Sequence, residues 1–151
     1  DVDLYEVIEE AALKKIKEFH FKIVGYDIDD ITLKKAQENI VSANLSEFIS
    51  LEHCDFFETE KGRDRQLFLV FNPPYDERIS IDNVERFYAN IGNTLKRSYP
   101  DSQAWMITSN LEALKHVGLR PSRKIKLFNG KLESRFVQYE MYSGSKKAKK
   151  Q

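Results

Sequence analysis

Apolar residues recur along the chain with two spacings, one typical of helices and the other typical of strands. Residues 1–20 and 30–43 carry apolar side chains three or four positions apart, which predicts an amphipathic helix in each segment. Asp29 or Asp30 can cap the second of these helices. A third helix is predicted to begin with a capping pair, Asp82 and Glu85. The apolar faces of the three helices consist of Leu4, Ile8, Ala11, Ala12, Ile16 and Phe19, then Leu33, Ala36, Ile40 and Ala43, and then Val84, Phe87, Tyr88, Ile91 and Leu95.

Short apolar runs between the helices predict strands. The run at 67–71 is continuous, so we expect a strand that is covered on both faces. A short helix is predicted over 111–117, ended by Gly118, and Asn129-Gly130 predicts a tight hairpin between the last two strands. The predicted strands cover about residues 23–26, 48–54, 67–71, 104–108, 123–128 and 133–142.

The alternation of strands and helices predicts the fold class. We expect an α/β protein with a Rossmann-like sheet that is mostly parallel, in which the hairpin makes the last strand antiparallel. Residues 1–142 should form one catalytic domain, which we expect to be a piece truncated at its N-terminal side. Residues 143–151 are polar and basic and should form a disordered tail.

Composition narrows the class of protein. The chain has 24 basic and 24 acidic residues, and this zero net charge argues against a stand-alone nucleic-acid binder, so most phosphate contacts should come from elsewhere. No apolar run is long enough to cross a bilayer. Cys54 is the only cysteine, which excludes an internal disulfide and fits a cytoplasmic protein. The three histidines, which we interpret as structural, lack metal-ligand spacing with Cys54, so we expect no metal; they are His20, His53 and His116.

The most informative motif is Asn72-Pro73-Pro74-Tyr75, which directly follows the buried run at 67–71. Two prolines explain a turn at this point, but they do not explain the whole cluster. The position just beyond the carboxyl end of a buried strand is where open α/β sheets bind their ligands. We therefore interpret the motif as a catalytic site.

These residue types suit chemistry on an exocyclic amine of a nucleic-acid base, whose nitrogen lone pair is delocalised into the ring. The amide oxygen of Asn72 and the carbonyl of Pro73 can both accept hydrogen bonds from that amine and favour a pyramidal nitrogen. The ring of Pro73 fixes the direction of its carbonyl. Tyr75 offers a face on which an unstacked base can lie.

Acidic residues at two strand ends suggest contacts to a nucleoside. Asp27 follows a strand and can accept hydrogen bonds from both hydroxyls of a ribose, as acids do in dinucleotide-binding folds. The alternative for an acid at such a position is a helix cap. Asp55 could reach an adenine amine in the same way, on a weaker signal. A further basic group could contact phosphate, although a solvated strand face explains it as well; it consists of Arg120, Arg123, Lys124 and Lys126.

Several sequence segments resemble known families. "NPPY", preceded by "GYDID" and "LKKAQENIVSANL", is similar to class I methyltransferases that act on base amines. "VFNPPYDERI" and "LFNGKLESRFVQYEMY" resemble the bacterial family that methylates guanine N2 in 23S ribosomal RNA. That family was long labelled N6-adenine-specific DNA methylase and usually carries a THUMP domain. The resemblance implies S-adenosylmethionine as cofactor and ribosomal RNA as partner. By motif match it implies catalytic roles for Asn72, Pro73, Pro74 and Tyr75, and cofactor contacts by Asp27, Ile28, Asp55, Phe56 and Asn72.

The sequence departs from that family in two places. Asp76 stands where a glycine is common, and the segment lacks the first strand and Gly-rich loop that enclose the methionine end of the cofactor. We therefore expect this chain alone to be inactive and to bind S-adenosylmethionine weakly or not at all. The strand at 23–26 should pair directly with the strand at 67–71, unless a neighbouring chain fills the gap.

Two other functions remain open from the sequence. A DNA adenine N6-methyltransferase would use the same four motif residues on a different base. A non-catalytic nucleic-acid-binding or assembly domain could keep the fold without the cofactor loop. The oligomeric state is not predicted.

Overall fold

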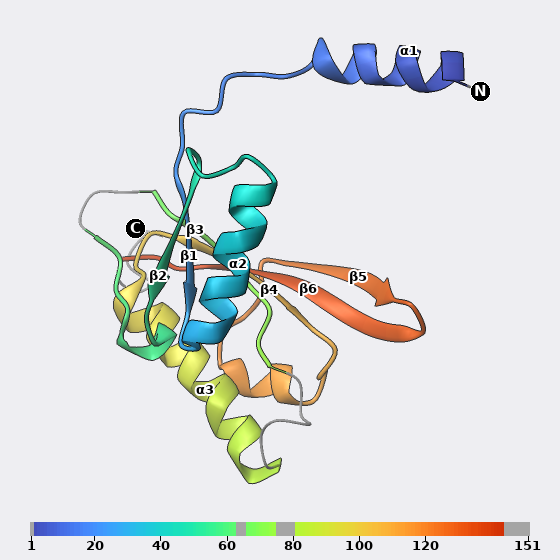
Figure 1. The fold of residues 1–151 in the computed structure, drawn as a ribbon. Coiled ribbons are helices and arrows are strands. Elements are labelled where there is room, and N and C mark those ends of the chain that lie inside the picture. Colours follow the sequence, from blue (N-terminus) through green and yellow to red (C-terminus); the bar gives the residue numbers. More distant parts are fainter. Residues whose placement is uncertain (1, 63–65, 75–80, 144–151) are drawn as a thin grey trace, which may run out of the picture. The chain divides into compact units, whose positions relative to one another are not determined.

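The computed structural model describes residues 2–62, 66–74 and 81–143, and the predicted tail from residue 144 lies outside them. The chain divides into two compact units, Asp1–Phe56 and Phe57–Gln151, and each is described by itself (Figure 1). None of the described helices is both long and apolar enough to cross a membrane.

The first unit contains two helices and a two-stranded parallel sheet. β1 and β2 pair in register from Ile23 with Ile49 to Asp27 with His53. Ile40 on α2 is the only described side chain of this unit that is both hydrophobic and buried. The elements in chain order are α1 (Val2–Leu13), β1 (Ile23–Asp27), α2 (Asp30–Ser42) and β2 (Ile49–His53).

The first helix is shorter than the sequence predicts. α1 ends at Leu13, where the backbone N–H groups of Lys15 and Ile16 bond three residues back and tighten the last turn. Phe19 does not extend the helix, because its ring packs edge to face against Phe21 and Phe48 at centroid distances of 5.8 and 5.9 Å. These aromatic contacts hold the segment before β1 out of the helix.

The second unit contains a four-stranded sheet in the order β3-β4-β6-β5. β3 and β4 are parallel, whereas β6 is antiparallel to both β4 and β5. The predicted antiparallel last strand is therefore confirmed. The elements are β3 (Phe68–Phe71), α3 (Ile81–Ser98), β4 (Gln103–Thr108), the 3-10 turn η3 (Ala113–Val117), β5 (Arg123–Asn129) and β6 (Leu132–Glu140), and the short η1 (Phe56–Glu58) spans the boundary between units.

The core of the second unit lies between α3, η3 and one face of this sheet. The predicted apolar face of α3 is confirmed, since Tyr88, Ile91 and Leu95 are almost fully buried. The hydroxyl of Tyr88 also forms a 2.6 Å hydrogen bond with Oγ1 of Thr108 on β4, which satisfies two buried polar groups. Gly118 ends η3 in the left-handed conformation, with φ of 64°, as the sequence predicts.

Two local predictions need correction, and a third is not tested: α3 spans Ile81–Ser98, but the side chain of Asp82, predicted to pair with Glu85 as a cap, lies outside the described side chains. β3 is not covered on both faces, because Phe68 and Val70, which share one face of the strand, are 60% and 71% exposed. The hairpin turn consists of Gly130 and the residue after it, because Asn129 still pairs within the ladder; Gly130 adopts φ of 61°.

The expected pairing between the strand at 23–26 and the strand at 67–71 is wrong. β1 and β3 belong to separate sheets, and β1 pairs with β2 only. Among the described residues no strand joins the two sheets, and β3 pairs with β4 only. The single continuous sheet predicted from the alternation of elements is therefore divided in two.

Candidate cofactor and base-binding residues

The carboxyl ends of β1 and β2 bring four of the predicted cofactor residues to one edge of the first unit. Asp27 is paired with His53, the last residue of β2, and its carbonyl accepts a 3.0 Å hydrogen bond from the backbone N–H of Cys54. Asp55 follows immediately. Because parallel strands end at the same edge, Asp27 and Ile28 at the end of β1 and Asp55 and Phe56 after β2 all come at this edge.

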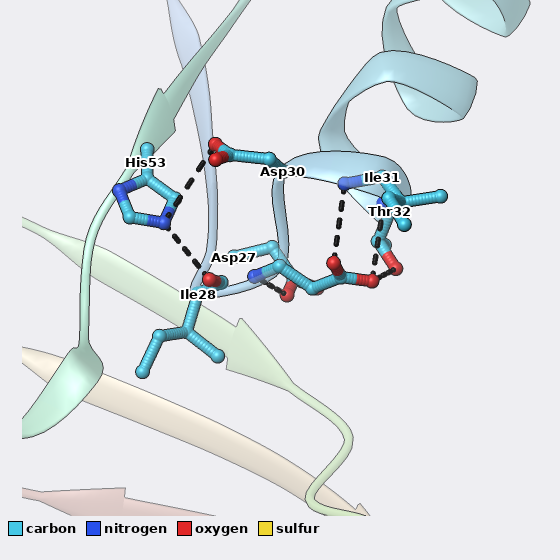
Figure 2. A network of polar contacts seen from close by, with 7 residues as sticks. Asp27, Ile28, Asp30, Ile31, Thr32 and His53 are labelled. Carbon is cyan, nitrogen blue, oxygen red and sulfur yellow. Dashed lines mark hydrogen bonds and ion pairs between the residues drawn. The ribbon is translucent and has the colours of Figure 1, made fainter.

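Asp27 has one carboxylate oxygen bonded within its own turn. The side chain is half-buried, and its Oδ1 accepts a 2.9 Å hydrogen bond from the backbone N–H of Asp29 (Figure 2). No described residue donates a hydrogen bond to Oδ2, so that oxygen can accept one from a ligand hydroxyl. The turn bond orients the carboxylate at the strand end and leaves one acceptor for a ligand.

Asp29 takes the capping role that the sequence left open between two aspartates. Its carboxylate accepts hydrogen bonds from the backbone N–H groups of Ile31 and Thr32 and a 2.7 Å bond from the Thr32 hydroxyl. The bond from the Thr32 side chain, followed by that from the Ile31 backbone, lowers the pKa of Asp29. The helix cap is thus supplied by Asp29, and Asp27 is not needed for it.

His53 is a residue of this edge whose contacts sequence reasoning did not identify. Its Nε2 lies 2.8 Å from the carbonyl oxygen of Ile28 and 3.7 Å from Oδ1 of Asp30 (Figure 2). The ring therefore ties the end of β2 to the turn that follows β1. The only sequence signal is its place at the end of a strand, because the hydrogen bond spans 25 residues. Within the described ranges no group of three or more His, Cys, Asp or Glu residues could hold a metal ion.

The predicted catalytic motif lies in the second unit. Asn72 directly follows the end of β3, and its side chain is exposed, as is that of Pro74. Pro73 between them is buried, which anchors the segment at the sheet edge. Tyr75, like Asp76, lies outside the described residues. Asn72, the fifth predicted cofactor residue, thus belongs to a different unit from the other four.

Comparison with known proteins identifies the family. The model of the RMKL-like methyltransferase domain matches residues 3–138. The chain belongs to this family. A relative from Cellvibrio japonicus (strain Ueda107), named ribosomal RNA large subunit methyltransferase K/L, is 33% identical over 124 residues, which are 80% of this chain and 16% of the relative. The chain therefore spans about a sixth of the length of this curated relative.

Solved structures of this family's fold superpose on the chain. A protein from Clostridium difficile 630, described as a possible methylase, is 31% identical with a TM-score of 0.79, covering 97% of this chain and 39% of that protein. A methyltransferase-like protein solved with bound SAH is 22% identical with a TM-score of 0.78, covering 93% of this chain and 37% of that protein. At this identity the likeness supports the fold only. The predicted α/β methyltransferase fold class is confirmed.

Proposed function

We propose that the protein containing this chain is an S-adenosylmethionine-dependent methyltransferase that modifies the N2 amine of a guanine in large-subunit ribosomal RNA. The observation that carries the proposal is the position of Asn72-Pro73-Pro74 at the carboxyl end of β3, in a unit with its own core. Membership of a methyltransferase family and the name of the Cellvibrio relative support it. A ribosomal RNA substrate also fits the predicted location in the cytoplasm.

The first unit offers groups that fit the nucleoside part of the cofactor. Oδ2 of Asp27 can accept a hydrogen bond from a ribose hydroxyl, and the half-buried carboxylate of Asp55 suits an adenine amine. Ile28 and Phe56 stand beside these acids and offer apolar contact to an adenine ring. S-adenosylmethionine bound here would supply an electrophilic methyl group. The residues of this edge would bind and orient it.

The second unit offers the groups that act on the base. The exposed amide oxygen of Asn72 and the carbonyl of Pro73 accept hydrogen bonds from the two amine protons and direct the nitrogen lone pair outward. Burial of Pro73 and the rings of both prolines fix that geometry before the base arrives. Tyr75 stacks on the base that has left its helix. These residues polarise and position the amine without a metal or a covalent intermediate.

Replacing Asn72 by alanine in the protein that contains this chain tests the proposal. Loss of this transition-state hydrogen bond should lower the single-turnover rate of methyl transfer to ribosomal RNA about 100- to 1,000-fold, by analogy with oxyanion-hole donors. Titration calorimetry should show cofactor affinity within about twofold of the parent, a change under 0.5 kcal/mol, because we assign Asn72 to the base amine and not to the cofactor contact that the resemblance implied. Asn93→Ala, at an exposed position of α3, is the matched control and should leave both values unchanged. A near-normal rate for Asn72→Ala contradicts the mechanism.

The identity of the methylated nucleoside tests the substrate. Mass spectrometry of digested product should show N2-methylguanosine when the protein acts on protein-free large-subunit RNA. Methyladenosine in duplex DNA, with no label in RNA, would instead favour the DNA adenine N6-methyltransferase that uses the same motif. Absence of transfer to any nucleic acid, together with an intact fold, would favour a binding domain.

A further inference from the structure

The hairpin of β5 and β6 concentrates positive charge that the rest of the chain balances. Residues 120–135 contain six Lys or Arg side chains and one Glu, a formal charge of +5, whereas the whole chain sums to zero. The six cationic residues are Arg120, Arg123, Lys124, Lys126, Lys131 and Arg135. A basic element in an otherwise acidic chain marks a surface for a polyanion.

The register of the hairpin places three of these six cations, Lys124, Lys126 and Arg135, on one face. Lys124, Lys126 and Phe128 alternate along β5 and therefore share a face. On β6, Arg135 lies opposite Lys126 and Glu133 lies opposite Phe128. At the base of the hairpin this face borders a groove of about 290 Å³ beside η3, and Lys124 and Arg135 line it.

The carboxylate of Glu133 pairs with two of the six cations, and the other four are not in ion pairs with described residues. Glu133 forms ion pairs with Lys126 and Arg135, and these bonds, first that of Lys126, lower its pKa. Lys124 and Lys131 form no ion pair with any described residue, nor do Arg120 and Arg123. The unpaired cations outnumber the paired ones, so the hairpin keeps an excess positive field toward a ligand.

The hairpin also extends toward the edge that carries the catalytic motif. β6 pairs with β4 up to Arg135 but continues with β5 to Leu132, so three residue pairs of the hairpin project beyond the carboxyl end of β4 (Figure 1). β3 ends at the same edge of the sheet at Phe71, and Asn72 follows it. The projecting part carries Phe128, which is 63% exposed and has Lys126 Nζ 5.0 Å from its ring centre.

We propose that the β5–β6 hairpin is an arm that binds single-stranded RNA flanking the target nucleotide, with its cations on phosphates and Phe128 stacked on a base. The proposal rests on the proposed function for the identity of the polyanion as RNA. An exposed aromatic ring among cations is the combination that single-stranded nucleic acids recognise, because each nucleotide presents one charge and one planar face. The arm and Asn72 lie at the same end of the sheet, with β4 between their strands, so the arm would hold the RNA strand while one base is presented to the motif.

Fluorescence anisotropy of a labelled single-stranded RNA with the 151-residue chain tests the charge contacts without any cofactor. The Lys124→Glu, Lys131→Glu variant breaks no ion pair seen among the described residues, and it should lower RNA affinity about tenfold or more and reduce the salt slope by about 1.4. Lys17→Glu, Lys22→Glu makes the same charge change at exposed positions of the first unit and should change affinity less than about twofold. Equal losses in both variants, or no loss in either, overturn the proposal.

Phe128→Ala tests the stacking contact and separates RNA from other polyanions. Stacking of one base predicts a loss of RNA affinity of about fivefold or more, with no change in the weaker binding of poly-glutamate. Phe21→Ala, at another exposed aromatic residue, is the control. Poly-glutamate that competes as well as RNA, or an unaffected Phe128→Ala variant, overturns RNA as the partner. Thermal melts of each variant check that it is folded. Methyl transfer is measured separately, in the protein that contains this chain. If methyl transfer fails, the RNA-binding result can still be interpreted, because it needs no catalysis.

Discussion

The two units differ sharply in how much side chain they bury. Of the 13 hydrophobic residues that are buried among those the structure describes, 12 belong to the second unit and Ile40 alone belongs to the first. The second unit supports Asn72 on a packed core, whereas the first supports Asp27 on two strands and one helix. The residues proposed to act on the base are thus held by packing, and those proposed to bind the cofactor are held mainly by local hydrogen bonds.

The largest effect should come from a single methyl group in the core of the second unit. A Cβ at Gly92 would lie 1.7 Å from the carbonyl oxygen of Val117, where α3 packs against η3. Gly92→Ala must separate these elements and should lower the free energy of unfolding by at least about 3 kcal/mol in urea titrations. Gly62→Ala, where nothing lies within 4 Å, should change it by under about 0.5 kcal/mol. Similar values for the two variants would show that α3 and η3 are not closely packed.

The next largest effect should be a loss of cofactor affinity at Asp27, with the fold of the second unit unchanged. In the protein that contains this chain, Asp27→Asn keeps an acceptor for the Asp29 N–H but removes the charge that strengthens a ribose hydrogen bond. We expect cofactor affinity to fall about 10- to 100-fold in calorimetry, the range for a hydrogen bond to a charged group. RNA affinity should not change. Asp30→Asn, at the exposed start of α2, is the control. Equal losses of cofactor affinity in both variants would remove Asp27 from the site.

Removing the ring of Tyr75 should slow methyl transfer and leave cofactor affinity unchanged, the reverse of what is expected for Asp27→Asn. Tyr75→Ala should slow single-turnover methyl transfer about 5- to 100-fold, because stacking of a base on an aromatic ring is worth about 1–3 kcal/mol. Tyr75→Phe should retain most of the rate, since stacking needs the ring and not the hydroxyl, and cofactor affinity should stay unchanged in both. A Phe variant as slow as the Ala variant would assign a role to the hydroxyl. Together with Asp27→Asn, this pair of variants tests whether the two units divide cofactor and base between them.

The contrast between units also explains which features the sequence could predict. The sequence predicts the apolar face of α3 and the existence of the β5–β6 hairpin, because helical periodicity and the Asn-Gly signal are local. The packing of the second unit's core is consistent with both local signals. The sequence does not predict where α1 ends, because the contact of Phe19 with Phe48 depends on tertiary packing. The exposure of Val70 depends on what packs against its face of β3, and a run of apolar residues does not contain that information.

Among the site residues the same division holds. The sequence places Asn72 after a strand and Asp27 at the end of one, and the structure agrees with these two positions, while the roles of both residues stay predictions. The choice between Asp29 and Asp30 as helix cap could not be predicted, because either one satisfies the local pattern and only the bonds to Ile31 and Thr32 decide it. The contact of His53 with the Ile28 carbonyl joins residues far apart in sequence, so no spacing rule reveals it.

The smallest effect concerns the acid sensitivity of the first unit. Hydrogen bonds hold the pKa of Asp29 below its ordinary value of 3.8, so the folded state binds the proton less readily than the unfolded state does. The stabilisation from this group is therefore fully present above the ordinary value and is lost as the pH falls through the lowered pKa. Asp29→Asn should cap α2 about as well at neutral pH, because both residues are good caps, but should lose less helix signal below that value than the parent. Circular dichroism between neutral and strongly acidic pH measures this difference, with Asp30→Asn as control. An acid transition identical in parent and Asp29→Asn would show that other carboxylates control the acid sensitivity of this unit.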